Sequence, residues 1–237
     1  MTNSFKIYDT YCTCCKKRFE DFITFEPNLH LNDPEGYNRY AHDVFCPYCA
    51  SAPRHRIMCL IFEEHPFDFS STLLFAPNSG LKLWLGNNNI NYKTADLLDS
   101  KADLQIDIQE TELPSDSFTF ISCDHMLEHI PSVEMALAEL YRITAPGGVT
   151  VITVPIKPDT DESFEDATIV TAQQRRKEYG RANHIRRFGY DVYKEFETVG
   201  FDVTTYYGYN FPPSIVPKVG PSEYDSNRVY VCKKPAT

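Results

Sequence analysis

The sequence lacks long hydrophobic runs, internal repeats, low-complexity tracts and any excess of basic residues. No apolar run approaches the roughly 18 to 20 residues that a membrane-spanning helix needs. The first ten residues, MTNSFKIYDT, contain no hydrophobic stretch of a secretory signal. These absences predict a cytoplasmic protein without a membrane span, in which the eight cysteines stay reduced rather than form disulfides.

The charge of the chain is strongly negative and unevenly distributed. The formal net charge is −10, yet residues 1–60 carry seven basic and seven acidic side chains, so the negative excess lies downstream. Broad binding to a phosphate backbone needs a basic surface, which argues against nucleic acid as a partner. With 237 residues, 42% of them hydrophobic, the chain can form one domain with a full core and a small appendage.

Four cysteines form two Cys-x-x-Cys pairs near the N-terminus, Cys12/Cys15 and Cys46/Cys49, separated by thirty residues. Each pair can grip a metal ion from a tight turn, and four thiolates complete a tetrahedral zinc shell without an open position for catalysis. We therefore predict a structural zinc knuckle over residues 1–52, with reduced, metal-free cysteines as the alternative. Cys14 is a spare thiol that could replace one of the four.

The stretch 118–155 has the pattern of a β-α-β unit. An apolar run at 118–122 is followed by the tripeptide CDH, by a helical pattern at 133–143 with Ser132 as a possible cap, by the sequence APGG and by a β-branched run at 149–154. Such a unit places its strands parallel in a buried sheet, and ligands bind beyond the carboxyl ends of these strands. We therefore expect the chemistry beside the CDH tripeptide and beside Pro155-Ile156.

Three short patterns in this stretch, HMLEHIPS, AL.EL.RI and APGG, agree in order and spacing with one family. The chain resembles class I S-adenosylmethionine-dependent methyltransferases of the broad group called type 11. The resemblance implies a Rossmann-like α/β fold, in which the sheet is mostly parallel and the last strand antiparallel. It also implies S-adenosylmethionine as the cofactor. The turn LPSDSF before the strand at 118 matches the LPxxSF pattern of the same family.

The upstream strands place candidate cofactor residues at the same edge of the sheet. The runs 72–75, 91–96 and 102–108 are expected to be the first three strands. A carboxylate such as Asp96 at a strand end can accept both ribose hydroxyls, with a helix cap or a solvated loop acid as the alternative. By resemblance, Asp107 lies where related enzymes hold the adenine amino group, with Ile108 beside the ring. The other candidates for cofactor binding are Ala76, Pro77, Asn78, Gly80, Cys123 and Asp124.

The turn after the first strand, APNSG, contains only one glycine. Most methyltransferases have a glycine-rich loop there, because the backbone must approach the cofactor closely. The turn is similar to the FAPxxG turn of a bacterial methyltransferase subset that carries an N-terminal zinc ribbon. The CPxC…RHR sequence at 46–56 is similar to the join between ribbon and helix in that subset. Its Arg54 and Arg56 are interpreted as partners of carboxylates, with contact to an anionic substrate as the alternative.

An insertion at about 156–190 follows the strand at 149–154, and its length beside the expected site predicts a lid or substrate platform. A helix is predicted at 172–179, between the cap Thr171 and the stop Gly180. The insertion is similar to the FED…DHxRxYG segment of the zinc-ribbon subset, with Asn183 in place of Asp. His184 is the candidate general base, because an unperturbed pKa near 6.5 suits proton removal from a hydroxyl. The alternative is that His184 only anchors the lid.

The sequence His125-Met-Leu-Glu128-His129 has a second interpretation. It fits the H-x-x-E-H pattern of a class of zinc peptidases, in which two histidines on one helix face ligate the same metal ion. Because the pattern here begins at a strand end, we expect His129 to be structural. His125 is expected near the transferred methyl group, as a second catalytic candidate. Arg186, which could also support the candidate base, and Tyr37 are the candidate substrate contacts.

The sequence therefore predicts an S-adenosylmethionine-dependent methyltransferase, with a domain at 53–237 behind the zinc knuckle. Its expected acceptor is an oxygen atom of a small polar metabolite, sugar or glycan precursor. Two alternatives remain open. An RNA-modifying methyltransferase would bind its RNA through the zinc knuckle and the basic clusters at 175–177 and 186–187. A non-catalytic binding module would keep the methyltransferase fold as a scaffold, and the glycine-poor turn at 76–80 supports that alternative.

Overall fold

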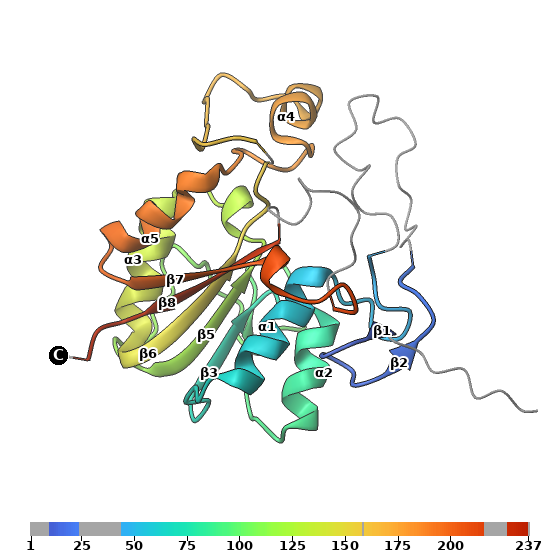
Figure 1. Cartoon of the computed structure of the whole chain (residues 1–237). Helices are drawn as coiled ribbons and strands as arrows, with labels where there is room; N and C mark the ends of the chain where they lie inside the picture. The colour runs from blue at the N-terminus through green and yellow to red at the C-terminus, as the bar shows by residue number, and fades with distance from the viewer. Residues whose placement is uncertain (1–9, 24–43, 158, 216–226, 237) are drawn as a thin grey trace, which may run out of the picture.

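A six-stranded sheet with the strand order β4-β3-β5-β6-β8-β7 forms the centre of the protein (Figure 1). The computed structural model describes residues 10–23, 44–157, 159–215 and 227–236, and the candidate substrate contact Tyr37 lies outside them. Four strands run parallel: β3 (Thr72–Phe75), β4 (Lys93–Ala95), β5 (Phe118–Asp124) and β6 (Thr144–Thr153). The last strand, β8 (Arg228–Lys233), runs antiparallel to its two neighbours, β6 and β7 (Asp202–Tyr207). This confirms the predicted Rossmann-like α/β fold.

Helices cover both faces of this sheet (Figure 1). On one side lie α1 (Pro53–Glu64) and α2 (Ser79–Asn87), and on the other lie α3 (Val133–Ile143) and α5 (Tyr193–Thr198). Alternate residues of a strand point to opposite faces, so Leu73 packs in the core with α3 and α5, while Leu74 packs in the core with α1 and α2. The protein therefore has three layers and two apolar cores.

The predicted β-α-β unit is present as β5, α3 and β6. The Oγ atom of Ser132 caps α3 by accepting the N–H of Met135 at 3.2 Å. The last strand of the unit begins earlier than expected, at Thr144, because the APGG sequence is part of β6 rather than a turn before it. Glycine is needed at position 148 in this strand, since a Cβ atom on Gly148 would lie 2.8 Å from the carbonyl oxygen of Ala145.

The strand predicted at 102–108 is wrong. One isolated bridge, between Ala95 and Leu104, joins this segment to the sheet, and β4 is the edge strand of the described sheet. Two backbone hydrogen bonds join Leu104 to β4 and to the residue after it, and beside them Asp103 Oδ2 accepts both the backbone N–H and the hydroxyl of Thr94 at 2.8 Å. The side chain of Asp103 thus takes a backbone N–H of β4 that a main-chain carbonyl would accept if the pairing continued as a strand.

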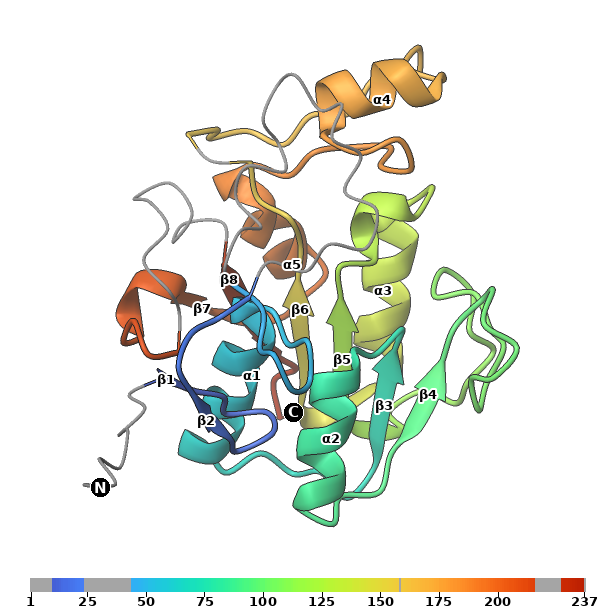
Figure 2. The same ribbon diagram turned by 90° about the vertical axis from the view of Figure 1, so that its right-hand side faces the viewer.

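The segment at 156–190, which we call the lid segment, lies beyond the carboxyl ends of the parallel strands. In Figure 2 the arrowheads of β3, β4, β5 and β6 point toward it and toward its helix α4 (Ala172–Tyr179). As predicted, this helix begins after Thr171 and ends at Gly180, which has a left-handed φ of 84°. Three short 3-10 helices complete the described elements: η1 (Leu127–His129), η2 (Tyr190–Val192) and η3 (Gly208–Asn210).

The two cysteine pairs lie in the part of the chain that we call the knuckle, residues 10–23 and 44–52. Its small hairpin, β1 (Thr10–Tyr11) and β2 (Arg18–Phe19), lies beside α1 and α2 (Figures 1 and 2). Buried side chains such as Cys12 and Phe22 belong to the same apolar core as these helices. The knuckle is therefore packed directly against one face of the sheet domain. Within the described ranges, no helix is long and apolar enough to cross a membrane.

Candidate functional site

The carboxyl ends of three parallel strands meet at one edge of the sheet. Phe75 of β3 pairs with the last residue of β4 on one side and with Cys123 of β5 on the other. Ala76 and Asp96 follow the last residues of β3 and β4, and Asp124 is the last residue of β5, so the three lie in one row at this edge. Three candidate cofactor residues that lie far apart in the sequence are thus aligned at the edge where ligands bind in open parallel sheets.

The turn after β3 begins with an unusual backbone conformation and ends with a capped helix. Ala76 has a φ of 43°, in the left-handed region where glycine is the usual residue. Half-buried Pro77 follows, and the side chain of Asn78 caps α2 by accepting the N–H of Gly80 at 2.7 Å. A Cβ atom on Gly80 would lie 3.0 Å from the Cβ of Ser51. Packing against the knuckle therefore requires this glycine, apart from any need of a cofactor.

Two of the candidate cofactor acids hold their own loops. Asp96 Oδ1 accepts two successive backbone N–H groups of the turn after β4, at 2.7 and 2.9 Å. Asp107 Oδ1 accepts the backbone N–H of Gln109 at 2.9 Å, and Ile108 between them is buried. Within the described part of the chain, these turn bonds use only Oδ1 of Asp96, so its Oδ2 can accept a ligand hydroxyl.

Asp124 is buried at the end of β5 and is paired with the first turn of α1. Its Oδ1 lies 2.8 Å from Arg54 Nε, and its Oδ2 lies 2.7 Å from His55 Nε2. Burial alone would raise the pKa of Asp124, but Arg54 and His55 hold that pKa well below its usual value. Both carboxylate oxygens are therefore committed to α1. The pairing of Arg54 with a carboxylate agrees with its interpretation from the sequence.

A hydrogen bond to the other ring nitrogen fixes the proton of His55. Nδ1 accepts the backbone N–H of Ala52 at 3.0 Å, so the ring proton lies on Nε2 and is donated to Asp124. Burial, and after it the charge of Arg54, lowers the pKa of His55, which keeps the ring neutral. Sequence analysis assigned His55 no role. No pattern in the sequence indicated a role at the start of the helix, because Ala52 has no side chain that could cap it.

A second group of polar side chains lies where β5 leads into η1. Glu128 and His129 of η1 and His184 of the lid segment place their ligand atoms within 4.8 Å of one another. Burial raises the pKa of Glu128 to about 8. Burial also lowers the pKa of His184 to about 4, with smaller contributions from His129 and Arg181. The ring of His125 adjoins this group, since its Nδ1 lies 3.4 Å from Glu128 Oε1. Both catalytic candidates therefore lie around one buried carboxyl group.

The backbone of His125 is strained immediately after β5. Its φ is 51°, which is uncommon for a residue with a Cβ atom, and its N–H donates to the carbonyl of Thr153 at 3.0 Å. Burial, and after it the charge of Arg54, holds the pKa of His125 well below its usual value. The imidazole is therefore neutral at pH 7, and strained residues of this kind gather at functional sites.

Arg186 anchors the lid segment to η1 and to its own neighbour Glu165. Its Nε donates to Glu165 Oε2 at 2.8 Å. Its terminal nitrogens donate to three backbone carbonyls of the η1 region, those of Leu127, Ile130 and Pro131. This arrangement favours support of the neighbouring His184, and substrate binding by Arg186 stays a prediction.

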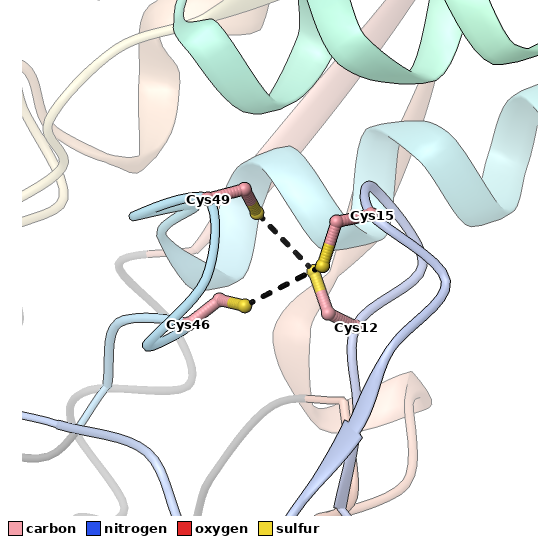
Figure 3. Close-up of side chains that lie close together, drawn as sticks. All are labelled: Cys12, Cys15, Cys46 and Cys49. Carbon is pink, nitrogen blue, oxygen red and sulfur yellow. Dashed lines mark hydrogen bonds between the residues drawn. The ribbon is translucent and has the colours of Figure 1, made fainter.

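Figure 3 shows the four cysteines of the two Cys-x-x-Cys pairs with their sulfur atoms turned toward one another. Cys12 Sγ lies 3.6 Å from Cys49 Sγ, and Cys15 Sγ lies 3.7 Å from Cys46 Sγ. All four sulfur atoms lie within 4.8 Å of one another. Zinc–sulfur bonds of about 2.3 Å in a tetrahedron place sulfur atoms about 3.8 Å apart, so the donor set and its spacing fit zinc. The spare Cys14 lies outside this group, in the apolar core.

Arg56 is buried beside the cysteines and is held by backbone carbonyls rather than by a carboxylate. Its guanidinium donates to the carbonyl oxygens of Val44, Ser51 and Ile215, at 2.9, 2.5 and 2.7 Å. It also lies 4.1 Å from the ring centre of Phe22. Burial lowers the pKa of Arg56 to about 10, so the side chain keeps its charge at pH 7. The interpretation from the sequence, a carboxylate partner, is therefore wrong for this arginine.

Glu128 is the functional candidate that sequence analysis left unassigned. Its side chain is 1% exposed, and its Oε2 has no hydrogen-bond partner among the residues that the structure describes. The H-x-x-E-H pattern contains this residue and His129. The third member of the group, His184, follows after the whole β-α-β unit and half of the lid segment, so only the fold brings it to the pair.

Solved structures share this architecture at low sequence identity. The YcgJ protein from Bacillus subtilis is similar over 77% of this chain and 100% of its own, with a TM-score of 0.51 and 12% identity. A 1,6-didemethyltoxoflavin-N1-methyltransferase from Burkholderia thailandensis is similar over 77% of both chains, with a TM-score of 0.51 and 14% identity. The [4+2]-cyclase SpnF is similar over 77% of this chain and 81% of its own, with a TM-score of 0.50 and 12% identity. These likenesses establish the fold alone. They do not assign an activity, since a cyclase and a methyltransferase share this fold.

A family comparison goes further than the fold. A search among curated proteins found no match. A family model described as a methyltransferase domain, however, matches residues 12–206, which include the four cysteines, the carboxyl edge of the sheet and the lid segment. The chain therefore belongs to this methyltransferase family and is a class I S-adenosylmethionine-dependent methyltransferase.

Proposed function

We propose that the protein transfers the methyl group of S-adenosylmethionine to an oxygen atom of a small polar metabolite, a sugar or a glycan precursor. The observation that carries this proposal is the group of histidines around Glu128 at the carboxyl edge of the sheet. A hydroxyl acceptor must lose its proton as its oxygen is methylated, and a neutral imidazole can accept that proton. The net charge of −10 supports a small acceptor over nucleic acid.

The residues at the carboxyl edge fit the cofactor, which supplies an electrophilic methyl group on a sulfonium. We assign the ribose to Asp96, because its Oδ2 is left over from the turn bonds. We assign the adenine to Asp107 and Ile108. Asp124 would contribute backbone atoms only, since α1 uses its carboxylate. The remaining contacts in this proposal come from Ala76, Pro77, Asn78, Gly80 and Cys123.

His184 accepts the proton in this proposal, with His125 beside it. Its Nδ1 lies 3.2 Å from the carbonyl oxygen of Tyr179, and a carbonyl only accepts, so Nδ1 carries the hydrogen and Nε2 the lone pair. The pKa of about 4 keeps the ring neutral at pH 7 but makes it a weak base. A group that lowered the pKa of the acceptor hydroxyl would therefore strengthen this site.

We also propose that the knuckle holds a structural zinc ion, as in the zinc-ribbon subset that the sequence resembles. The spacing of the four sulfur atoms supports this, and so does the buried charge of Arg56 beside them. In this proposal residues 1–52 form a zinc-bound segment ahead of a methyltransferase domain at 53–237, and residues 156–190 form its lid. Arg186 and Tyr37 stay the candidate substrate contacts.

Calorimetric titration with S-adenosylhomocysteine tests the cofactor site. We expect micromolar binding by the wild-type chain and loss of at least about tenfold in affinity for Asp96→Ala, because hydrogen bonds to the ribose are removed. Asp99→Ala is the matched control, since it changes an exposed acid in the same loop whose Oδ1 bonds only a local N–H at 2.9 Å. No binding by the folded, zinc-loaded protein would favour the scaffold alternative.

A methyl-transfer assay tests the acceptor class. The assay compares small polyhydroxylated acceptors and short RNAs, each with the wild-type protein and labelled cofactor. We expect transfer to a small hydroxyl compound and little dependence on salt. Transfer to RNA, together with RNA binding that weakens steeply as salt rises, would instead support the RNA-modifying alternative.

A further inference from the structure

Three side chains with metal-ligating atoms converge beside the lid segment. Glu128 and His129 come from η1 and His184 comes from the lid segment, and their ligand atoms lie within 4.8 Å of one another. The side chain of Glu128 is 1% exposed and His184 is 6% exposed, whereas His129 is 34% exposed and opens the group to one side. The group therefore combines a buried interior with an accessible face.

The tautomers of both histidines follow from their backbone partners. His129 Nδ1 lies 3.0 Å from the carbonyl oxygen of Asn183, and His184 Nδ1 lies 3.2 Å from that of Tyr179. A carbonyl oxygen can only accept, so each Nδ1 carries the hydrogen and each Nε2 has its lone pair free. Histidines that bind metals almost always donate their other ring N–H in this way, which sets the ring orientation.

The carboxyl group of Glu128 has a buried oxygen atom, Oε2, without a hydrogen-bond partner among the described residues. Glu128 Oε1 lies 3.9 Å from His129 Nε2, which has no hydrogen to donate in the tautomer fixed by Asn183. Buried polar atoms are rarely left without a partner. Burial, which raises the pKa of Glu128 to about 8, keeps a proton on this carboxyl group at pH 7, so a cation shared with the two imidazole nitrogens would bind in exchange for that proton.

The group is held in place before any ligand arrives. The backbone N–H of Ile185 donates to the carbonyl of Glu128 at 3.0 Å, which joins the lid segment to η1 beside the group. Arg186 strengthens this joint through its bonds to the carbonyls around η1. A metal site with prearranged ligands spends less free energy on ordering them when the ion binds.

We propose that Glu128, His129 and His184 bind one divalent transition-metal cation next to the methyl-acceptor site. Two imidazoles and one carboxylate suit ions such as Zn²⁺, Mn²⁺ and Fe²⁺, and three protein ligands leave coordination positions open. The site differs from the four-cysteine group, which has a closed set of soft ligands. His125 lies at its border, with Nδ1 3.4 Å from Glu128 Oε1.

The catalytic part of this inference rests on methyl transfer to a hydroxyl, as in the proposed function, but replaces His184 as the proton acceptor. An acceptor hydroxyl on the ion would have a lowered pKa and would lose its proton to water. Its oxygen then forms the C–O bond with an electron pair, while the sulfonium sulfur keeps the pair of the broken C–S bond. His184 would thus act as a metal ligand rather than as the base. Open adjacent positions favour acceptors with two neighbouring oxygens, such as vicinal diols or hydroxy acids.

Titration of the zinc-loaded, full-length protein with Mn²⁺, followed by electron paramagnetic resonance, tests the site. Mn²⁺ prefers nitrogen and oxygen ligands, so it does not compete for the four thiolates. We expect about one bound Mn²⁺ per chain, and binding weakened at least about tenfold in Glu128→Gln and His184→Gln. His65→Gln is the matched control, because His65 bonds the hydroxyl of Tyr206 at 2.8 Å, away from the group.

Two results would overturn the inference: no Mn²⁺ binding by the wild type, or undiminished binding by Glu128→Gln. Crystals of the wild type soaked in Mn²⁺ keep the test valid if a variant does not fold, since an anomalous peak between the three side chains is expected. Titration of the same samples with S-adenosylhomocysteine separates the two proposals. Cofactor binding without Mn²⁺ binding removes the metal site alone, and Mn²⁺ binding without cofactor binding removes the proposed function alone.

Discussion

Among the described residues, side chains that could hold a metal ion gather in two places, and the two groups differ in the number and kind of their ligands. The cysteine group has four thiols from two short loops, with paired sulfur distances of 3.6 and 3.7 Å. The Glu128 group has one carboxylate and two imidazoles, from η1 and the lid segment. Four soft ligands close a zinc shell, whereas three mixed ligands leave it open. The first group is suited to hold a fold and the second to act on a ligand.

The surroundings of the two groups reinforce this difference. The cysteine group lies against the buried guanidinium of Arg56, which donates to three backbone carbonyls. The Glu128 group has an unpartnered oxygen and lies at the carboxyl edge of the sheet, where the cofactor residues are aligned. A comparison of the two groups by mutation therefore separates stability from catalysis.

The largest loss of stability is expected when the cysteine group is changed. Cys46→Ser removes one of four thiolates, and structural zinc contributes about 10–16 kcal/mol of apparent folding free energy in small zinc modules. We expect loss of zinc and unfolding of the knuckle, measured by metal analysis and thermal denaturation. Cys14→Ser is the control and should keep about one zinc per chain, since Cys14 lies outside the group. Equal zinc content in both variants would mean that the cysteine group is not the zinc site.

The next effect concerns Asp124, which joins the knuckle side of the molecule to the strand edge. Asp124→Asn breaks a buried pair with Arg54 and should lower the free energy of unfolding by about 3–5 kcal/mol at pH 7. The folded pKa of Asp124 lies below its unfolded value of about 3.9. The stabilisation is therefore full above about pH 4 and is lost as the pH falls through the folded pKa.

Urea denaturation at several pH values measures this effect. The difference between wild type and Asp124→Asn should narrow below about pH 4. Asp116→Asn is a suitable control, because Asp116 pairs with Lys234 at 2.6 Å on the surface and should cost less than about 1 kcal/mol. If the difference in unfolding free energy between wild type and Asp124→Asn stayed constant with pH, the charge of the Asp124 carboxylate would not be what stabilises its contact with α1.

A smaller effect, on the activation free energy of methyl transfer, is expected when a metal ion is removed from the Glu128 group alone. Brief treatment with a chelator should lower methyl transfer by about a hundredfold, because Lewis-acid activation is worth several kcal/mol. The melting temperature should stay nearly unchanged, since the closed zinc shell loses its ion more slowly. Addition of Mn²⁺ should restore the activity. Full activity in chelator would contradict the metal proposal and leave His184 as the base.

The smallest effect separates the two roles of His184. His184→Ala should leave binding of S-adenosylhomocysteine intact and lower methyl transfer at least about tenfold, whether it acts as a base or as a ligand. His129→Ala should match this loss only if both residues bind the same ion. Kinetic assays of the two variants under saturating cofactor decide between the roles, and unchanged turnover in His184→Ala would remove this residue from the chemistry.

Elements whose boundaries are set by neighbouring residues could be predicted from the sequence. The helices α3 and α4 begin at Ser132 and Thr171, whose side chains cap them, and α4 ends at Gly180. The third strand could not be predicted in the same way. Its apolar pattern is that of a strand, but the side chain of Asp103 takes a backbone N–H of β4 that a strand would pair with its main chain.

The two metal-binding groups show the same limit. The cysteine pairs could be found from spacing, because each pair is a local turn and the two pairs differ little in environment. The Glu128 group could not be found in this way, because its third member, His184, lies in the lid segment, far from Glu128 and His129 in the sequence. His55 escaped notice for a related reason, because its role depends on meeting Asp124 at the end of β5.

The first turn of α1 has a consequence for how such a chain can be divided. His55 takes its tautomer from the N–H of Ala52, on the knuckle side, and donates its proton to Asp124, at the strand edge. A cut between residues 52 and 53 would leave that imidazole free to change tautomer and a buried carboxylate with one partner fewer. The first turn of α1 therefore makes contacts with both the knuckle and the strand edge, so a change on one side alters contacts on the other.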